Sequence, residues 1–289
     1  MKTIPIISTV PPGSLNPQPP VLHSLGEGGS TFNRHKAFTI IELLVVISII
    51  AILAALLLPV LSKVKITAQK RQAAVEISQI VGAIQQYDSV YGRFPVSTLD
   101  QQLAGTNDIT CGGKGYDLSG VNQLWTMGVT NNEEVITILM DITTYSNGVP
   151  TVNYNHVKNP QQTIFLNAKM SGDARSPGVG TDLVYRDPWG NPYIISMDLN
   201  YDEQCQDSNY CRQAVSQNPP GPTYVQTGFN GLYNPNVTPA SPDQLNDFLY
   251  HGKVMVWSAG PDRKIDMPPI FNWGAANQGF NKDNVLSWK

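Results

Sequence analysis

Charged side chains, histidines and enzyme motifs are all scarce in this chain of 289 residues. Only 14% of the residues are charged and the formal net charge is −3, which argues against the broad basic surface that nucleic-acid binding requires. After residue 37 the only histidines are His156 and His251, and they stand in unrelated contexts. The sequence also lacks the G-x-S-x-G, H-E-x-x-H and phosphate-loop motifs of common enzyme classes. These absences indicate that the chain is not an enzyme.

Three cysteines are too few for a disulfide scaffold or for a zinc site built from thiolates. Cys205 and Cys211 stand close together in a polar stretch, and Cys111 is distant from both. In an oxidising compartment such a close pair closes a small loop. Cys205 and Cys211 are therefore the candidate disulfide, which leaves Cys111 over.

One long apolar run contrasts with this polar background. Residues 38–58 read FTIIELLVVISIIAILAALLL, and Glu42 is the only charged residue among them. At about 1.5 Å of helical rise per residue, the run spans roughly 30 Å, which is the thickness of the hydrocarbon core of a bilayer. A carboxylate inside lipid is costly and needs a partner. The run therefore predicts a membrane-spanning helix, and the partner of Glu42 becomes the route to its function.

The residues before the run have the wrong order for a secretory signal peptide. A basic stretch, residues 33–36, is followed by Ala37, and only then by Phe38 and the apolar run. In a signal peptide the small residue at the cleavage site comes after the apolar stretch. Cleavage after Ala37 would instead leave the whole run on the mature chain, with Phe38 as its new amino terminus.

The segment from Lys36 to Leu43, KAFTIIEL, resembles the processing site of type IV prepilins and of the pseudopilins of type II secretion. The resemblance implies cleavage after Ala37 by a prepilin peptidase and N-methylation of Phe38, with Lys36 in the basic flank. Ala37 stands where the family usually has Gly. Pro59 matches a position at which many family members carry Pro.

Glu42 is the fifth residue of the expected mature chain, where the family carries Glu. The resemblance implies that its carboxylate pairs with the amino terminus of a neighbouring subunit in a helical filament and so sets the axial register of assembly. An ion pair in lipid is more favourable than either lone charge. The alternative is an ordinary signal anchor, with Glu42 at the membrane interface as a neutral or snorkelling acid.

A helical stripe continues beyond the run. Apolar residues recur there at steps of three, four or seven, namely Ile66, Ala73, Ile77, Ile80, Ile84, Tyr87 and Tyr91. Gly92 and Pro95 predict the end of the helix, and Pro59 predicts a kink where it leaves the membrane. We therefore expect one helix of about 50 residues. Its transmembrane half is residues 38–60, and its amphipathic half is residues 61–95.

Residues 96–289 are expected to form a globular head, and residues 1–37 a leader that processing removes. Short helices are predicted over Glu133–Tyr145 and from Ser241-Pro242, and strands over Thr163–Leu166, Tyr193–Met197 and Lys253–Ser258. Together with the long helix, these elements predict an α+β fold, in which the helix packs on a small antiparallel sheet with enlarged loops, as the pilin resemblance also implies.

Two further segments are similar to parts of the major pseudopilins of type II secretion. One is DPWGNPY, residues 187–193, which those proteins carry at the first strand of the sheet. The other, residues 258–264 together with 283–288, resembles their calcium-binding loop. It makes Asp262, Asp283, Asn284 and Asp266 the candidate ligands of a Ca²⁺ ion, which prefers such oxygen donors. The alternative is a solvated acidic turn.

The resemblance implies a structural subunit that assembles into a periplasmic filament for type II protein secretion. Its expected partners are further copies of the chain, minor pseudopilins, prepilin peptidase, the inner-membrane assembly platform with its ATPase, and the lipid bilayer. A single pass through a bacterial inner membrane would place the head in the periplasm. The alternatives are a type IV pilin of a surface fibre for adhesion, motility or DNA uptake, and a membrane-anchored periplasmic hydrolase or carbohydrate-binding protein.

Overall fold

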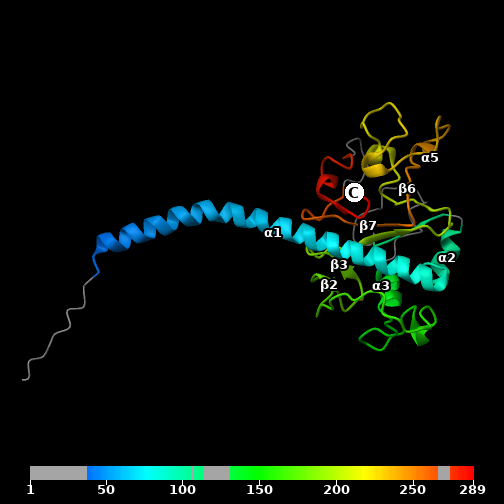
Figure 1. Cartoon of the computed structure of the whole chain (residues 1–289), viewed down its shortest axis with the longest axis horizontal. Helices are drawn as coiled ribbons and strands as arrows, with labels where there is room; N and C mark the ends of the chain where they lie inside the picture. The colour runs from blue at the N-terminus through cyan, green and yellow to red at the C-terminus, as the bar shows by residue number, and fades with distance from the viewer. Residues whose placement is uncertain (1–37, 106, 113–130, 266–273) are drawn as a thin grey trace, which may run out of the picture. The chain divides into compact units, whose positions relative to one another are not determined.

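The computed structural model describes residues 38–105, 107–112, 131–265 and 274–289 (Figure 1). Contacts divide the chain into two units, Met1–Ala54 and Ala55–Lys289. The second unit contains the sheet and the hydrophobic core, and it also contains the C-terminal part of the long helix.

Helix α1 runs from Ile40 to Tyr91, a length of 52 residues, and it is uninterrupted at position 59. It ends as the sequence predicts. Gly92 adopts a φ of +63°, and its N–H donates to the carbonyl of Asp88 at 2.7 Å. A residue without a Cβ is favoured in this left-handed conformation, so Gly92 closes the helix. The kink expected at Pro59 stays a prediction, because the side chain at that position lies outside the described residues.

A four-stranded antiparallel sheet forms the centre of the head, in the order β1-β4-β7-β8. Its strands are β1 (Ile109–Cys111), β4 (Ile194–Met197), β7 (Val254–Ser258) and β8 (Val285–Leu286). In the longest pairing, Ile195 lies opposite Val256. Two small two-stranded sheets join β2 (Gly178–Val179) to β3 (Tyr185–Arg186) and β5 (Gln204–Cys205) to β6 (Tyr250–His251). The expected α+β fold is confirmed.

The apolar stripe of α1 packs on one face of the central sheet. Successive strand residues point to opposite faces, and one set, which includes Ile195 and Val256, shares a buried cluster with Ile77, Ile84 and Tyr87 of the helix. Helix α3 (Glu133–Leu139) belongs to the same cluster. The apolar stripe predicted from the sequence is therefore the face of α1 that packs against the hydrophobic core of the head.

The large insertion between β4 and β7 covers the other face of the sheet. Ile194, Met255 and Trp257 point to this face and pack against residues of the insertion such as Tyr210 and Phe248. The insertion folds into β5, α4 (Gln213–Ser216), η3 (Phe229–Gly231), α5 (Pro242–Leu245) and β6. The enlarged loop of the sequence thus gives the sheet a second hydrophobic layer.

Two expectations about the region from 133 to 166 were wrong. Helix α3 stops at Leu139 rather than Tyr145, because Asp141 takes a left-handed φ of +55°. Residues 163–166 form no strand, since the side chain of Asn159 binds both the N–H and the carbonyl of Thr163. The strands expected near β4 and β7 and the Ser241 N-cap of α5 are confirmed. Helix α2 (Thr98–Ala104) and the short turns η2 (Tyr154–His156) and η4 (Asn281–Asp283) were not predicted.

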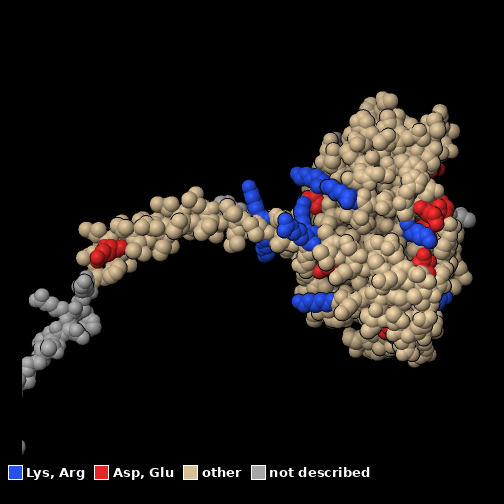
Figure 2. Space-filling view, in the orientation of Figure 1, with Lys and Arg blue, Asp and Glu red and all other residues tan. Residues whose placement is uncertain are grey.

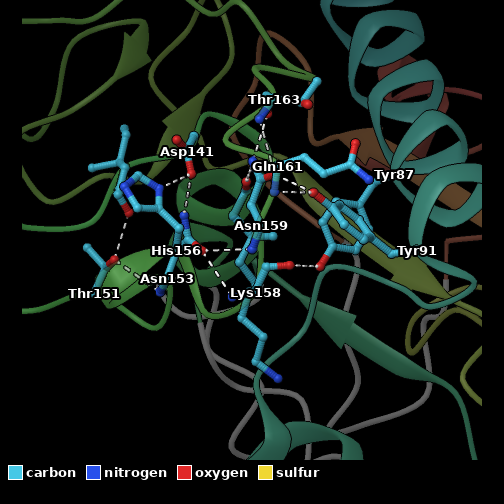
Figure 3. Close-up of polar contacts among 12 residues, drawn as sticks. Tyr87, Tyr91, Asp141, Thr151, Asn153, His156, Lys158, Asn159, Gln161 and Thr163 are labelled. Carbon is cyan, nitrogen blue, oxygen red and sulfur yellow. Dashed lines mark hydrogen bonds and ion pairs between the residues drawn. The ribbon is translucent and has the colours of Figure 1, made fainter.

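Buried asparagines tie the end of α1 to the loops beside it (Figure 3). Tyr91 donates its hydroxyl hydrogen to Asn159 Oδ1 at 2.7 Å, and Tyr87 donates to the carbonyl of Lys158 at 2.5 Å. The Oδ1 atom of Asn153 accepts from the backbone N–H groups of Lys158 and Asn159. Because Asn153 and Asn159 are fully buried, these bonds replace the water that their amides would otherwise need.

Candidate functional site

Glu42 lies in the first turn of α1 and forms a capping box with Thr39. The N–H and the hydroxyl of Thr39 both donate to Glu42 Oε2, at 2.9 and 2.8 Å, and the Glu42 N–H donates to Thr39 Oγ1 at 3.2 Å. Reciprocal bonds of this kind satisfy two N–H groups that a helix start leaves unpaired. Within a single chain, therefore, Glu42 already has a partner.

The capping box was not predicted, although its signal is in the sequence. Thr39-Ile-Ile-Glu42 has the S/T-x-x-E spacing that marks the start of a helix. A Gln can take the place of Glu in such a box, but it cannot form an ion pair with a positively charged amine. The two roles of Glu42, capping and pairing with a neighbour, can therefore be separated by mutation.

The predicted cleavage site lies at the start of the described part of the chain. Lys36 and Ala37 fall outside the described residues, as does the side chain of Pro59. Phe38 is described, and it precedes the helix with 71% of its surface exposed. The processing roles of Lys36, Ala37 and Phe38 and the assembly role of Pro59 stay predictions.

The apolar run of α1 exposes nearly all of its large side chains. From Ile40 to Leu58 these side chains are between 45% and 83% exposed. Soluble proteins do not leave a continuous apolar surface of this size in water. Among the described residues, α1 is the one helix that is long and apolar enough to cross a membrane. Such a surface fits a segment that is anchored in a membrane.

The DPWGNPY segment forms a turn around the buried carboxylate of Asp187. Its Oδ1 accepts from the N–H groups of Trp189 and Asn191, both at 2.9 Å. Its Oδ2 accepts from Asn191 Nδ2 at 2.9 Å and from the hydroxyl of Ser258, on β7, at 2.5 Å. Burial raises the pKa of Asp187, and these hydrogen bonds act in the opposite direction. The Asp187 carboxylate thus holds the turn together and fastens it to strand β7 of the sheet.

The C-terminal loop brings together two of the candidate calcium ligands. Burial, together with the nearby charge of Asp262, raises the pKa of Asp283, while Lys70 lowers it. Gly260 has a φ of +73°, and a Cβ on it would come within 2.5 Å of the carbonyl oxygen of Asp283. Only a glycine allows this close approach of the 258–264 segment to the end of the chain.

The loop offers oxygen atoms that lack partners. Asp283 Oδ1 and Asn284 Oδ1 are buried and accept no hydrogen bond from any described residue. Asn284 Nδ2 donates to the hydroxyl of Tyr210 at 2.9 Å, and the Lys264 N–H donates to Asp262 Oδ1. Buried acceptors without partners are costly and suit a hard cation. No group of three His, Cys, Asp or Glu side chains in the described segments could hold a metal ion, and Asp266 lies outside those segments.

Comparison with known proteins adds one finding at the N-terminus. Residues 32–58 match the family described as Prokaryotic N-terminal methylation motif. The chain carries a prepilin-type methylation motif. The motif supports the pilin and pseudopilin family, processing by prepilin peptidase, and assembly with other pilin-like subunits. With the apolar helix, it fits a protein anchored by a single membrane pass. No curated protein and no solved structure matches the chain.

The structure contains Cys205 and Cys211 as two separate buried thiols, so the disulfide expected between them is not present in it. Cys205 sits in β5 and packs in the cluster on the second face of the sheet, and the Cys211 thiol donates to the carbonyl of Ser208 at 3.7 Å. Burial raises the pKa of Cys205 well above its usual value and that of Cys211 to about 12. Both cysteines therefore serve the core as small apolar side chains.

The two histidines of the head have structural partners. His156 Nδ1 lies 2.8 Å from Asp141 Oδ1, which also accepts from Asn153 Nδ2 at 2.9 Å (Figure 3). The His251 ring stacks on Tyr233 with ring centroids 4.2 Å apart. These contacts account for both side chains as supports of the loops around the sheet.

Proposed function

We propose that this chain is a pseudopilin, a structural subunit that assembles through α1 into a periplasmic filament of a type II secretion system. The observation that carries the proposal is the methylation motif of residues 32–58, with Glu42 at the fifth position after the expected cleavage. The exposed apolar surface of the same helix would serve first as the membrane anchor and then as the filament core. Prepilin peptidase would cut after Ala37, and the assembly ATPase would drive addition of the processed subunit.

Two features of the head favour a pseudopilin over a pilin of a surface fibre. The DPWGNPY turn joins α1, through Gln69 and Pro188, to β7, through Asp187 and Ser258. The C-terminal loop carries partly unpaired oxygen atoms rather than a disulfide. The two segments resemble parts of major pseudopilins in sequence, and this resemblance is what supports this branch of the family as the proposal.

Deletion of the chain from its host distinguishes the two functions. If it is a pseudopilin, secreted enzymes are expected to accumulate in the periplasm and to return to the medium on complementation. Mass spectrometry of the medium and the periplasm measures this, and electron microscopy counts surface fibres in the same cells. Normal secretion with a loss of surface fibres would refute the secretion role and identify a pilin.

The C-terminal loop is proposed as a calcium site held by Asp262, Asp283 and Asn284. The ion would neutralise the two adjacent carboxylates and fix the end of the chain against the sheet. Burial and, after it, the nearby Asp262 carboxylate raise the pKa of Asp283, and a bound cation would offset the repulsion between these two acids. Asn284 in place of a second Asp gives the site one charge fewer, so binding should be weak.

Calcium is therefore expected to raise the melting temperature of the detergent-solubilised chain. At ten times the dissociation constant, the rise should be roughly 3–6 °C. Asp262→Ala should remove the rise, whereas Asp243→Ala, at an acid in the first turn of α5, should keep it. Differential scanning calorimetry with calcium and with a chelator measures both. Identical melting curves of the unsubstituted protein in the two conditions would eliminate the site.

A further inference from the structure

A run of positive charge follows the membrane-spanning segment on the side of the globular part. Lys63, Lys65, Lys70 and Arg71 lie on α1, and no acidic residue occurs from 43 to 75. Only two basic residues, in the stretch 33–36, precede the run directly. The positive-inside rule concentrates Lys and Arg on the cytoplasmic side, so it does not explain a cationic segment next to a head outside the cytoplasm.

Two further cations line a surface cavity of about 550 Å³ beside this part of α1. Arg175 and Arg263 are exposed, and Trp189 lies in the wall between the two loops that carry them. The Trp189 side chain is only 8% exposed, and its Nε1–H finds no acceptor within the described structure. Pro188, also in the wall, accepts a hydrogen bond at 3.2 Å from Gln69, the neighbour of Lys70 on α1.

The cations of α1 and those of the cavity occupy one region of the head. The charge of Lys70 lowers the pKa of Asp283, which burial raises, so Lys70 lies near Asp283. Gly260 also lies close to Asp283, and Arg263 follows Gly260 by three residues. Figure 2 shows several Lys and Arg side chains, with acidic side chains among them, where this stretch of α1 meets the globular part. This region is called the basic collar, and it consists of Lys63, Lys65, Lys70, Arg71, Arg175 and Arg263.

The collar cations are not used for internal ion pairs. The salt bridges between described residues join Asp141 to His156, Asp182 to Arg186, and Asp88 to Lys253, and none involves the collar. Asp173 lies in the cavity wall, but its carboxylate is engaged by the N–H groups of Arg175 and Ser176 and by the Ser176 hydroxyl. Asp262 and Asp283 lie in the same region, but the cations there outnumber the acids, so the collar is locally positive in a chain whose net charge is −3.

The first two cations of the collar, Lys63 and Lys65, lie at the depth of the lipid headgroups, and Lys70 and Arg71 lie farther out along α1. At about 1.5 Å per residue, Lys63 lies about 8 Å and Arg71 about 20 Å beyond Leu58. The headgroup layer extends roughly 5–8 Å beyond the hydrocarbon core, and charges act across a further Debye length of about 8 Å. Val60, Leu61 and Val64 are more than half exposed between these cations, as expected for a segment that enters the interface while its lysines snorkel.

We propose that the basic collar binds the anionic phospholipid headgroups of the bilayer that anchors α1. The proposal rests on that anchoring and holds for a pilin as well as for a pseudopilin. The cations of α1 attract the anionic surface, and the cavity between Arg175 and Arg263 receives one phosphate-bearing headgroup. Each cation near an anionic surface contributes about a fivefold gain in binding. The collar thus retains the subunit at anionic lipid before assembly.

Hydrogen exchange of the full chain in nanodiscs tests the collar directly. One set of discs contains phosphatidylcholine alone, and the other contains phosphatidylcholine with phosphatidylglycerol. Amides of residues 173–176, 189–190, 260 and 262–264 should exchange at least about fivefold more slowly in the anionic discs, consistent with one bound headgroup. High salt should reverse the protection, because the interaction is electrostatic.

Variants that remove the same number of charges at two different places show whether Arg175 and Arg263 are the residues that bind the headgroup. Arg175→Gln with Arg263→Gln should abolish the protection, whereas Lys158→Gln with Lys253→Gln, which removes two charges elsewhere on the head, should leave it intact. Exchange of the buried α1 segment 77–87 reports whether each variant is folded. Loss of protection in the control pair but not in the collar pair would overturn the assignment.

Three results would refute the collar. Equal exchange in the two kinds of disc would exclude lipid recognition, and it would leave the anchor and the pseudopilin role standing because the chain is inserted in both. Equal protection by inorganic phosphate added to the neutral discs would identify a site for a soluble anion. Equal protection by added duplex DNA in neutral discs would assign the surface to nucleic acid instead.

Discussion

Replacing Glu42 with Val is expected to abolish assembly of the subunit into filaments while cleavage before Phe38 continues. The variant removes the carboxylate that we propose pairs with the amino terminus of the next subunit, and it leaves that amine without a partner inside an apolar filament core. Shearing and sedimentation of filaments measure assembly, and the mass of the membrane-bound subunit measures cleavage. Filaments in unchanged amount would contradict the assembly role of Glu42.

The capping box requires two companion variants, because Glu42 also caps its own helix. Glu42→Gln preserves an acceptor for Thr39 and removes only the charge, so it should fail to assemble as Glu42→Val does. Thr39→Ala removes the cap and keeps the charge, so it should still form filaments. The opposite pattern, with assembly by Glu42→Gln and failure of Thr39→Ala, would show that helix capping is what assembly needs.

Of the substitutions proposed for the head, Asp187→Ala is expected to lower the free energy of unfolding the most. It leaves four buried donors without their acceptor, from Trp189, Asn191 and Ser258, and each unsatisfied group costs about 1–3 kcal/mol. With partial relaxation, the free energy of unfolding should fall by roughly 3–5 kcal/mol. Thermal unfolding of the detergent-solubilised chain should show a midpoint lower by about 10 °C.

Asp173→Ala is the matched control for this variant. Asp173 also accepts two backbone N–H groups and one serine hydroxyl, but it is exposed, so water replaces the lost acceptor. Its melting temperature should stay close to that of the unsubstituted chain. Equal losses in the two variants would show that burial of the Asp187 carboxylate does not determine the stability of the turn.

The sequence predicted those parts of the fold in which local pattern and tertiary packing agree. The stripe through Ile77, Ile84 and Tyr87 is the buried face of α1, and Gly92 ends the helix. The runs near β4 and β7 are strands because each is apolar on both faces and is covered on both. Ser241 caps α5 through a bond to the Gln244 N–H.

The predictions of secondary structure that were wrong concern residues 140–145 and 163–166. There, a side chain bonds to the backbone or a residue adopts an unusual backbone conformation. Asn159 takes both backbone groups of Thr163, so an apolar segment that reads as a strand runs as a loop. Asp141 adopts a left-handed conformation within a segment that reads as helix. The Asn159 bonds join residues only four apart, but apolar periodicity does not report hydrogen bonds between a side chain and the backbone.

The candidate sites show the same division. The N-terminal motif was readable because its residues are contiguous, and the match over residues 32–58 supports it. The basic collar was not predicted, since Arg175 and Arg263 reach the cavity wall from loops far apart in the chain. The expected disulfide between Cys205 and Cys211 is absent from the structure, where both thiols are buried in the head.

The intact mass of the chain extracted from its native membrane tests the central claim most directly. A prepilin-type subunit should be found as a chain that begins at Phe38 and carries one added methyl group on its amino terminus. A chain that keeps residues 1–37, or one that begins after Leu58 and so has lost the apolar run, would contradict the account.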